Sequence, residues 1–90
     1  MVLTMETLED ILEYLDKSIK NLAKESIENL EIDGGLTGIL NFLENQFDVR
    51  LENMLVVKKS SIHHLESGMK NKIIQRKQLT IGRITKQYRN

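Results

Sequence analysis

The neighbouring histidines His63 and His64 are the first side chains to consider for chemistry, because the unperturbed charge of imidazole changes near neutral pH. They could serve in acid–base catalysis or bind a metal ion. Adjacent helical residues, however, point about 100° apart, and a helical metal pair needs a spacing of three or four residues. Ser60 with His64, or His63 with Glu66, has that spacing but has no third ligand nearby. We therefore predict no metal site here and place both histidines on a polar face.

Four carboxylates near the start of the chain could suggest a cation site or a pair of catalytic acids; they are Glu9, Asp10, Glu13 and Asp16. A carboxylate metal site in a helical bundle needs inward-facing Glu-x-x-His, whereas this chain has the reverse order at His63 and Glu66. Spacings of three and four residues are also those of one solvated helix face. We expect these acids to face water.

The glycine and nucleophile motifs of common enzymes are missing from the sequence. It has no phosphate-binding loop with a lysine, no Gly-x-Ser-x-Gly and no Gly-x-Gly-x-x-Gly. Gly34, Gly35 and Gly38 precede an apolar segment and suit a turn better than an anion site. With no cysteine, no tryptophan and four other aromatic residues, the chain has few anchors for a deep ligand pocket. We predict a protein that is not an enzyme and has no catalytic residues and no cofactor.

Charge is divided between the two ends of the chain: residues 1–33 carry a net charge of −6 and residues 67–90 one of +7, although the whole chain is neutral. The basic end could bind a polyanion such as nucleic acid, with an affinity that falls steeply as salt rises; its candidate residues are Lys72, Arg76, Lys77 and Arg83. Alternatively, the two ends neutralise each other, within one chain or across a dimer. We favour the second interpretation, because no base-reading motif accompanies the basic residues.

The strongest helical pattern occupies the first third of the chain. Its apolar residues recur at steps of three and four, which predicts one buried stripe; they are Leu8, Ile11, Leu12, Leu15, Ile19, Leu22, Ala23, Ile27 and Leu30. Thr4 or Thr7 can cap the start of this helix. The run Asp33-Gly34-Gly35 predicts its end and a hairpin bend, because glycine accepts the left-handed backbone of a helix C-terminal turn.

A second apolar stripe of helical spacing runs from Leu36 to Leu55 and predicts a second helix, antiparallel to the first. Residues 56–61 are β-branched, charged or cap-forming, so we predict a break there and a third helix from Ser61. The alternative is one unbroken helix to about Gln78, because the apolar residues keep nearly the same phase. Such a helix would be about 60 Å long and would demand a partner chain.

The last residues of the chain are poor in helix formers. Residues 79–85 alternate partly in hydropathy, as in a short strand or a frayed segment. We therefore predict two parts: a helical domain at residues 1–78 and a basic, mobile C-terminal tail at residues 79–90.

Together these patterns predict an all-α fold, in which an antiparallel helical hairpin is extended to a small, oligomeric three-helix bundle. A chain of 90 residues buries only a thin core, so self-association would help it. We predict a protein–protein interaction module (an adaptor, inhibitor or assembly protein) that binds a second copy or another protein. The residues expected in its packed seams are Leu15, Leu22, Leu40, Phe47, Met54, Leu65 and Met69.

The start of the sequence lacks the basic residues and apolar run of a cleaved signal peptide, and no segment is apolar enough to span a bilayer. A cytoplasmic location is the default expectation, with secretion that uses no cleaved signal as the alternative. In length, helical hairpin and glycine-bearing bend, the chain resembles small secreted helical-hairpin proteins of Gram-positive bacteria, but it lacks their tryptophan at the bend and their C-terminal Tyr-x-x-x-acid signal. It is also similar in outline to bacteriocin immunity proteins, a fold-level analogy without matching residues. Neither resemblance assigns the chain to a family.

Overall fold

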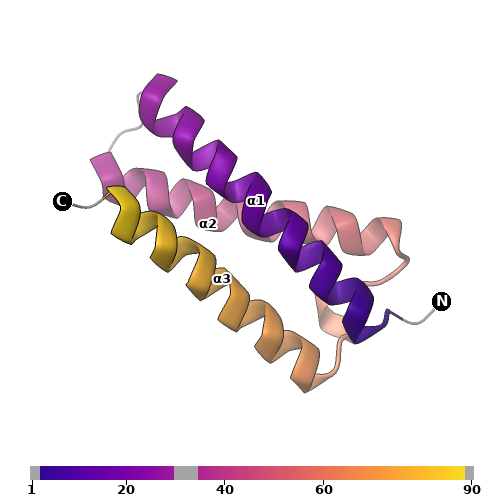
Figure 1. Cartoon of the computed structure of the whole chain (residues 1–90). Helices are drawn as coiled ribbons and strands as arrows, with labels where there is room; N and C mark the ends of the chain where they lie inside the picture. Colours follow the sequence, from indigo (N-terminus) through magenta and orange to yellow (C-terminus); the bar gives the residue numbers. More distant parts are fainter. Residues whose placement is uncertain (1–2, 30–34, 89–90) are drawn as a thin grey trace.

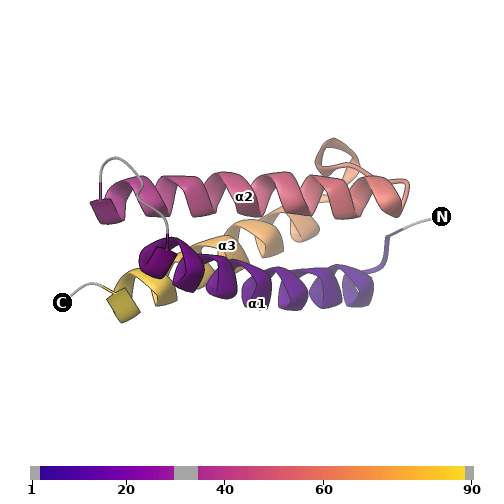
Figure 2. The same ribbon diagram turned by 90° about the horizontal axis from the view of Figure 1, so that it is seen from above.

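Three helices lie side by side in the computed structural model of the chain, which describes residues 3–29 and 35–88. Helix α1 spans Met5–Asn29, α2 spans Gly35–Val57 and α3 spans Ser67–Tyr88. Helices α1 and α3 point the same way and α2 points the opposite way, so the three form an up-down-up bundle (Figure 1). The view from above shows α2 running antiparallel beside α1 (Figure 2). The predicted all-α class and the three-helix bundle are confirmed.

Helix α1 begins with a side-chain cap. The Oγ1 atom of Thr4 accepts a hydrogen bond of 3.1 Å from the backbone N–H of Thr7, the third residue of the helix. Leu3, which precedes the cap, and Leu8, at the fourth helical position, are both buried, and these are the positions of a hydrophobic staple. The cap and the staple together fix the start of the helix, with Thr4 rather than Thr7 as the capping residue.

An apolar core fills the space between the helices. Most of it comes from α1 and α2, whose large side chains without solvent exposure are Leu8, Leu12, Leu15, Ile19, Leu43, Phe47, Leu51 and Leu55. The apolar row of α3 is sparser, because Arg76 and Thr80 interrupt it. A buried side chain of this size contributes about 1.5 to 3 kcal/mol, so the α1–α2 hairpin carries most of the apolar stabilisation. None of the described helices has the length and apolar character needed to cross a membrane.

Helix α2 ends without the help of proline or glycine. The backbone N–H of Ser60 donates a hydrogen bond of 2.8 Å to the carbonyl of Leu55, and that of Lys59 donates one of 2.9 Å to the carbonyl of Val56. This pair of bonds is the Schellman motif, which places a left-handed residue at the position of Lys59. Lys59 has a φ of +58°, a conformation that costs an L residue about 1 to 2 kcal/mol. The helix is therefore ended by backbone hydrogen bonds that outweigh a local conformational cost.

The connection between α2 and α3 decides between the two predicted arrangements. The alternative of one unbroken helix to Gln78 is wrong, because the chain turns after Val57 and passes through a short 3-10 helix, η1, at Ile62–His64. The predicted break is confirmed, but α3 begins at Ser67 and not at Ser61. The residues between them form η1, in which the backbone N–H of His64 bonds to the carbonyl of Ser61.

The end of the chain also differs from its prediction. Helix α3 passes through Gln78 without interruption and continues to Tyr88, so the short strand considered for residues 79–85 is wrong. Ile81 and Ile84 are buried in the core, and the hydroxyl of Thr85 bonds to the carbonyl of Ile81 one turn earlier. Tertiary packing here outweighs weak helix propensity.

The predicted bend lies partly outside the described residues, which leave out Asp33 and Gly34. Gly35 is described and is the first residue of α2. Its φ of +61° is left-handed, a conformation that glycine adopts without steric cost.

The strained end of α2 gives a first prediction. We expect Lys59→Gly to raise the free energy of unfolding by about 1 kcal/mol, because the relief of left-handed strain exceeds the extra backbone entropy of glycine in the unfolded chain. Lys59→Ala removes the same charge but keeps the Cβ atom, so it should give no such gain. Urea unfolding of the three proteins measures the difference, and a less stable glycine variant would contradict the Schellman assignment.

Candidate functional site

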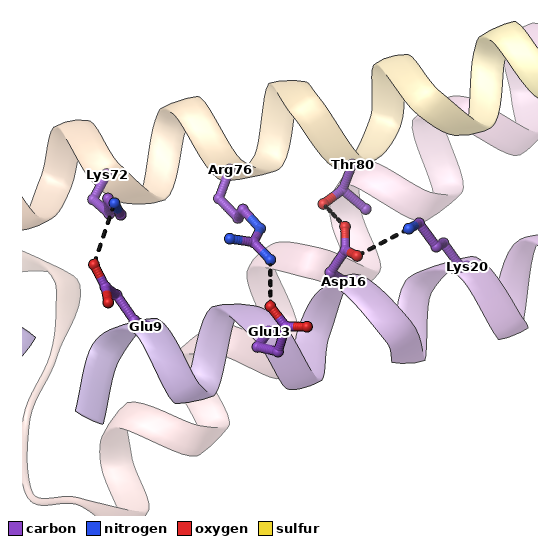
Figure 3. A network of polar contacts seen from close by, with 7 residues as sticks. All are labelled: Glu9, Glu13, Asp16, Lys20, Lys72, Arg76 and Thr80. Carbon is purple, nitrogen blue, oxygen red and sulfur yellow. Dashed lines mark hydrogen bonds and ion pairs between the residues drawn. The ribbon is translucent and has the colours of Figure 1, made fainter. Parts of the chain in front are cut away.

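A row of polar contacts joins α1 to α3, and we call it the charged seam (Figure 3). Lys72 Nζ lies 3.3 Å from Glu9 Oε1, and Arg76 Nη2 lies 2.7 Å from Glu13 Oε2. One turn further along, Thr80 Oγ1 donates a hydrogen bond of 2.6 Å to Asp16 Oδ1. The three contacts follow one another because α1 and α3 are parallel and their polar residues advance by three or four positions, so each turn of one helix meets one turn of the other. The seam is defined by Glu9, Glu13, Asp16, Lys72, Arg76 and Thr80.

Asp16 is the buried charged residue of the charged seam, with 5% of its surface exposed, and its partner Thr80 is buried as well. Its second carboxylate oxygen lies 3.0 Å from Nζ of Lys20, one turn along the same helix. Burial by itself raises the pKa of Asp16, but the hydrogen bonds from Thr80 and Lys20 and the nearby charges of Lys20 and Arg76 outweigh it, so the pKa lies below its ordinary value. The carboxylate is therefore held charged inside the bundle.

A second set of polar contacts ties α2 to its neighbours. Lys77 Nζ lies 3.0 and 2.9 Å from the two carboxylate oxygens of Asp48, which joins α3 to α2. On the other side of α2, a guanidinium nitrogen of Arg50 donates a hydrogen bond to the hydroxyl of Ser18 on α1. These contacts lie at the border of the core, where a partly exposed ion pair contributes at most about 1 kcal/mol.

Most of the residues predicted as a polyanion site form ion pairs with acidic side chains of the same chain. Lys72, Arg76 and Lys77 each form an ion pair with α1 or α2. Arg83 is exposed and forms no ion pair with a described residue. Lys72 and Arg76 thus pair with acids of the acidic end within one chain, whereas Lys77 pairs with Asp48 of α2, which lies outside that end.

One acidic residue of α1 corrects the expectation that all four acids at its start face water. Glu9, Asp10 and Glu13 are exposed as predicted, but Asp16 is buried and faces Thr80. The signal in the sequence was the matched spacing of the two helices: acids at positions 9, 13 and 16 against polar residues at 72, 76 and 80. That signal becomes readable only when α1 and α3 are known to be parallel.

The residues predicted for packed seams lie in the core of the monomer. Leu15, Phe47, Leu65 and Met69 are buried. The remaining three, Leu22, Leu40 and Met54, are half-buried and packed against that core. These seven side chains are therefore used within the chain, and a surface for a partner has to be sought elsewhere.

The histidines lie in η1, and one of them has a serine partner. His64 Nδ1 is 3.0 Å from the hydroxyl of Ser61, and both histidines are exposed. The pair considered for a metal site at the sequence level was Ser60 with His64, whereas the observed contact of His64 is with Ser61. A nucleophilic serine needs a histidine whose other nitrogen is oriented by a third group, and no such bond is present among the described residues. Nor do the described residues include a group of three His, Asp or Glu side chains placed to hold a metal ion.

A groove runs along the junction of α2 and α3, and sequence reasoning missed it. It consists of two adjoining hollows, of about 470 Å³ and 260 Å³, which share Ile74 and Lys77. One hollow extends to Glu44, Ile81 and Gly82, and the other to Asp48, Ile62, Lys70 and Ile73. Ile74 is 53% exposed at the point where the hollows meet. We call this feature the α2–α3 groove, and isoleucines as well as charged and polar side chains line it.

The buried carboxylate gives a prediction for pH. The folded-state pKa of Asp16 is lowered, so its contribution to stability is present above the unfolded pKa and is lost as pH falls through the folded pKa. Asp16→Asn removes the titrating group, so its free energy of unfolding should fall less than that of the wild type between about pH 5 and pH 2. Asp10→Asn, at an exposed acid of the same helix, is the control. Equal slopes for wild type and Asp16→Asn would contradict the assignment.

The hydroxyl of Thr80 gives a separate prediction. Thr80→Val keeps the shape of the side chain but removes the donor to Asp16, so the pKa of Asp16 should rise and the protein should lose about 1.5 to 3 kcal/mol of stability at neutral pH. Thr85→Val, whose hydroxyl bonds only to its own helix among the described residues, should change stability by less. Carboxyl NMR titration and urea unfolding measure the two effects.

Three comparisons with known proteins give the same result. No protein-family model matches the chain. No curated protein and no solved structure matches it either. A function for this chain therefore rests on the contacts, burial and charges described above.

Proposed function

We propose that the protein is a non-enzymatic helical protein–protein interaction module, acting as an adaptor, inhibitor or assembly protein, which associates with itself. The observation that carries this proposal is the α2–α3 groove. Ile74 stands half-exposed between two hollows, and the neighbouring side chains of Ile62, Ile73 and Ile81 give the groove an apolar floor. Apolar grooves between helices are the surfaces into which amphipathic helices of protein partners dock.

The ion pairs of the basic residues favour a protein–protein interaction module over a nucleic-acid-binding regulator. A phosphate chain would have to displace Glu9 from Lys72, Glu13 from Arg76 and Asp48 from Lys77. Each displaced acid would then stand near the incoming phosphates and repel them. Charge reversal at Lys72, Arg76 or Lys77 would also disturb the bundle itself, so it could not separate a binding defect from a folding defect.

The size of the groove sets the expected strength of association. Burying the exposed part of one isoleucine and its neighbours removes a modest apolar area from water. Each Å² of that area contributes about 25 cal/mol of favourable free energy. Small interfaces of this kind are weak and transient, because the loss of rotational and translational freedom consumes most of the gain. We expect a dissociation constant on the order of micromolar.

The proposal predicts the behaviour of the whole chain in solution. Molecular mass measured by sedimentation should rise with protein concentration through the micromolar range and persist at high salt, because the contact is mainly apolar. Addition of a short duplex DNA should leave the mass unchanged. A compact monomer at every concentration would overturn self-association, and a gain of mass with DNA that high salt abolishes would favour the basic end as a polyanion site.

A further inference from the structure

We propose that the face of the protein that bears the α2–α3 groove packs against the same face of a second copy. The two copies are related by a two-fold axis near Ile74, so that their α3 helices run antiparallel. This inference rests on the proposed self-association and names the surface through which it occurs. Two-fold dimers are the commonest protein assemblies, and their interface is one self-complementary patch. The α2–α3 groove meets that requirement in both its charge and its apolar centre.

The two ends of the groove carry opposite charges. Glu44 lines the end towards the C-terminus of α3, and Lys70 lines the other end. The ion pair between Lys77 and Asp48 lies between these two ends, and there the charges of α2 and α3 already neutralise each other. Neither Glu44 nor Lys70 forms an ion pair with a described residue. A two-fold axis across the groove brings Lys70 of one copy to Glu44 of the other, twice in each dimer.

The distances along α3 agree with this pairing. Glu44 precedes Asp48 by one turn of α2, so in the antiparallel α3 it lies level with Ile81, one turn after Lys77. The span from Lys70 to that level is about 16 Å at 1.5 Å per residue. The midpoint of this span falls between Ile74 and Lys77. A two-fold axis at that point places Ile74 of one copy next to Ile74 of the other. The apolar contact is then central and the charges lie at the rim, the usual order of a protein interface.

The wall of the groove is open to solvent at Gly82. Gly82 lines the hollow at the Glu44 end, and a Cβ atom built on it would meet nothing within 4 Å. A facing backbone can approach closely at such a position. The chain as a whole is neutral, so two copies approach without net repulsion, and the opposite charges at the two ends select the antiparallel orientation.

The apolar centre is tested by Ile74→Glu in the full chain. In the dimer this change places two carboxylates at the axis, so the dissociation constant should rise at least tenfold. Leu79→Glu is the matched control: Leu79 is on the same helix, is 46% exposed and lies beside Lys72 and Arg76, away from the groove. It should leave association unchanged. Sedimentation measures the mass, and circular dichroism checks that both variants remain helical.

The orientation is tested by exchanging the charges at the ends. Lys70→Glu faces Glu44 of the second copy, and Glu44→Lys faces Lys70, so each variant alone should dimerise about tenfold more weakly than the wild type. Mixed in equal amounts, the two variants carry complementary ends at both contacts. The mixture should therefore recover the affinity of the wild type, a result that a damaged fold could not produce.

The outcomes separate this inference from the proposed function. If the wild type does not associate, the proposed self-association fails, and this interface fails with it. If the wild type associates but Ile74→Glu associates equally well, the proposed function stands and the groove is not its surface. If Ile74→Glu is monomeric and the mixed charge variants do not recover, the antiparallel two-fold arrangement is overturned and another helix occupies the groove.

Discussion

The carboxylate of Asp16 is the constraint on which the arrangement of α3 depends. Within the described residues it is the charged side chain that the bundle buries, and a buried charge without partners would cost several kcal/mol. Thr80 and Lys20 satisfy it by hydrogen bonds, and Arg76 adds a favourable charge. A slide of α3 by one turn would separate Thr80 from Asp16 and also break the two ion pairs of the charged seam. The seam thus sets the register of α3 against α1.

That register has a consequence for the rest of α3. Positions that would supply apolar contacts towards α1 are occupied by Arg76 and Thr80, so α3 has a sparser apolar row than α1 or α2. The junction of α3 with α2 is bridged by one described ion pair, between Lys77 and Asp48, and stays open on either side of it. The exposed Ile74 is left at this junction. The same polar contacts that fix α3 towards α1 therefore leave an opening towards α2, at which Ile74 is exposed.

The turn between α2 and α3 shows how the up-down-up order is made. The Schellman bonds at Leu55 and Val56 end α2 and force Lys59 into a left-handed conformation. The following residues form η1, and Leu65 then enters the core before α3 begins. Burial of Leu65 and Met69 offsets the strain at Lys59, because both side chains reach the core only if the chain reverses there.

The sequence by itself determined the helices and their faces, since the apolar steps of three and four in Leu8 to Ala23 and in Leu43 to Leu55 require burial on one side. It also contained the division of charge, but it left open whether those charges meet within one chain. Tertiary structure decided three things: the end of α2 at Lys59, the helical state of residues 79–88 and the burial of Asp16. Each depends on partners far away in sequence. Propensity describes a residue and its near neighbours, whereas Thr80 is stable in its helix because Asp16 stands opposite, and the α2–α3 groove exists because α3 is held in that register.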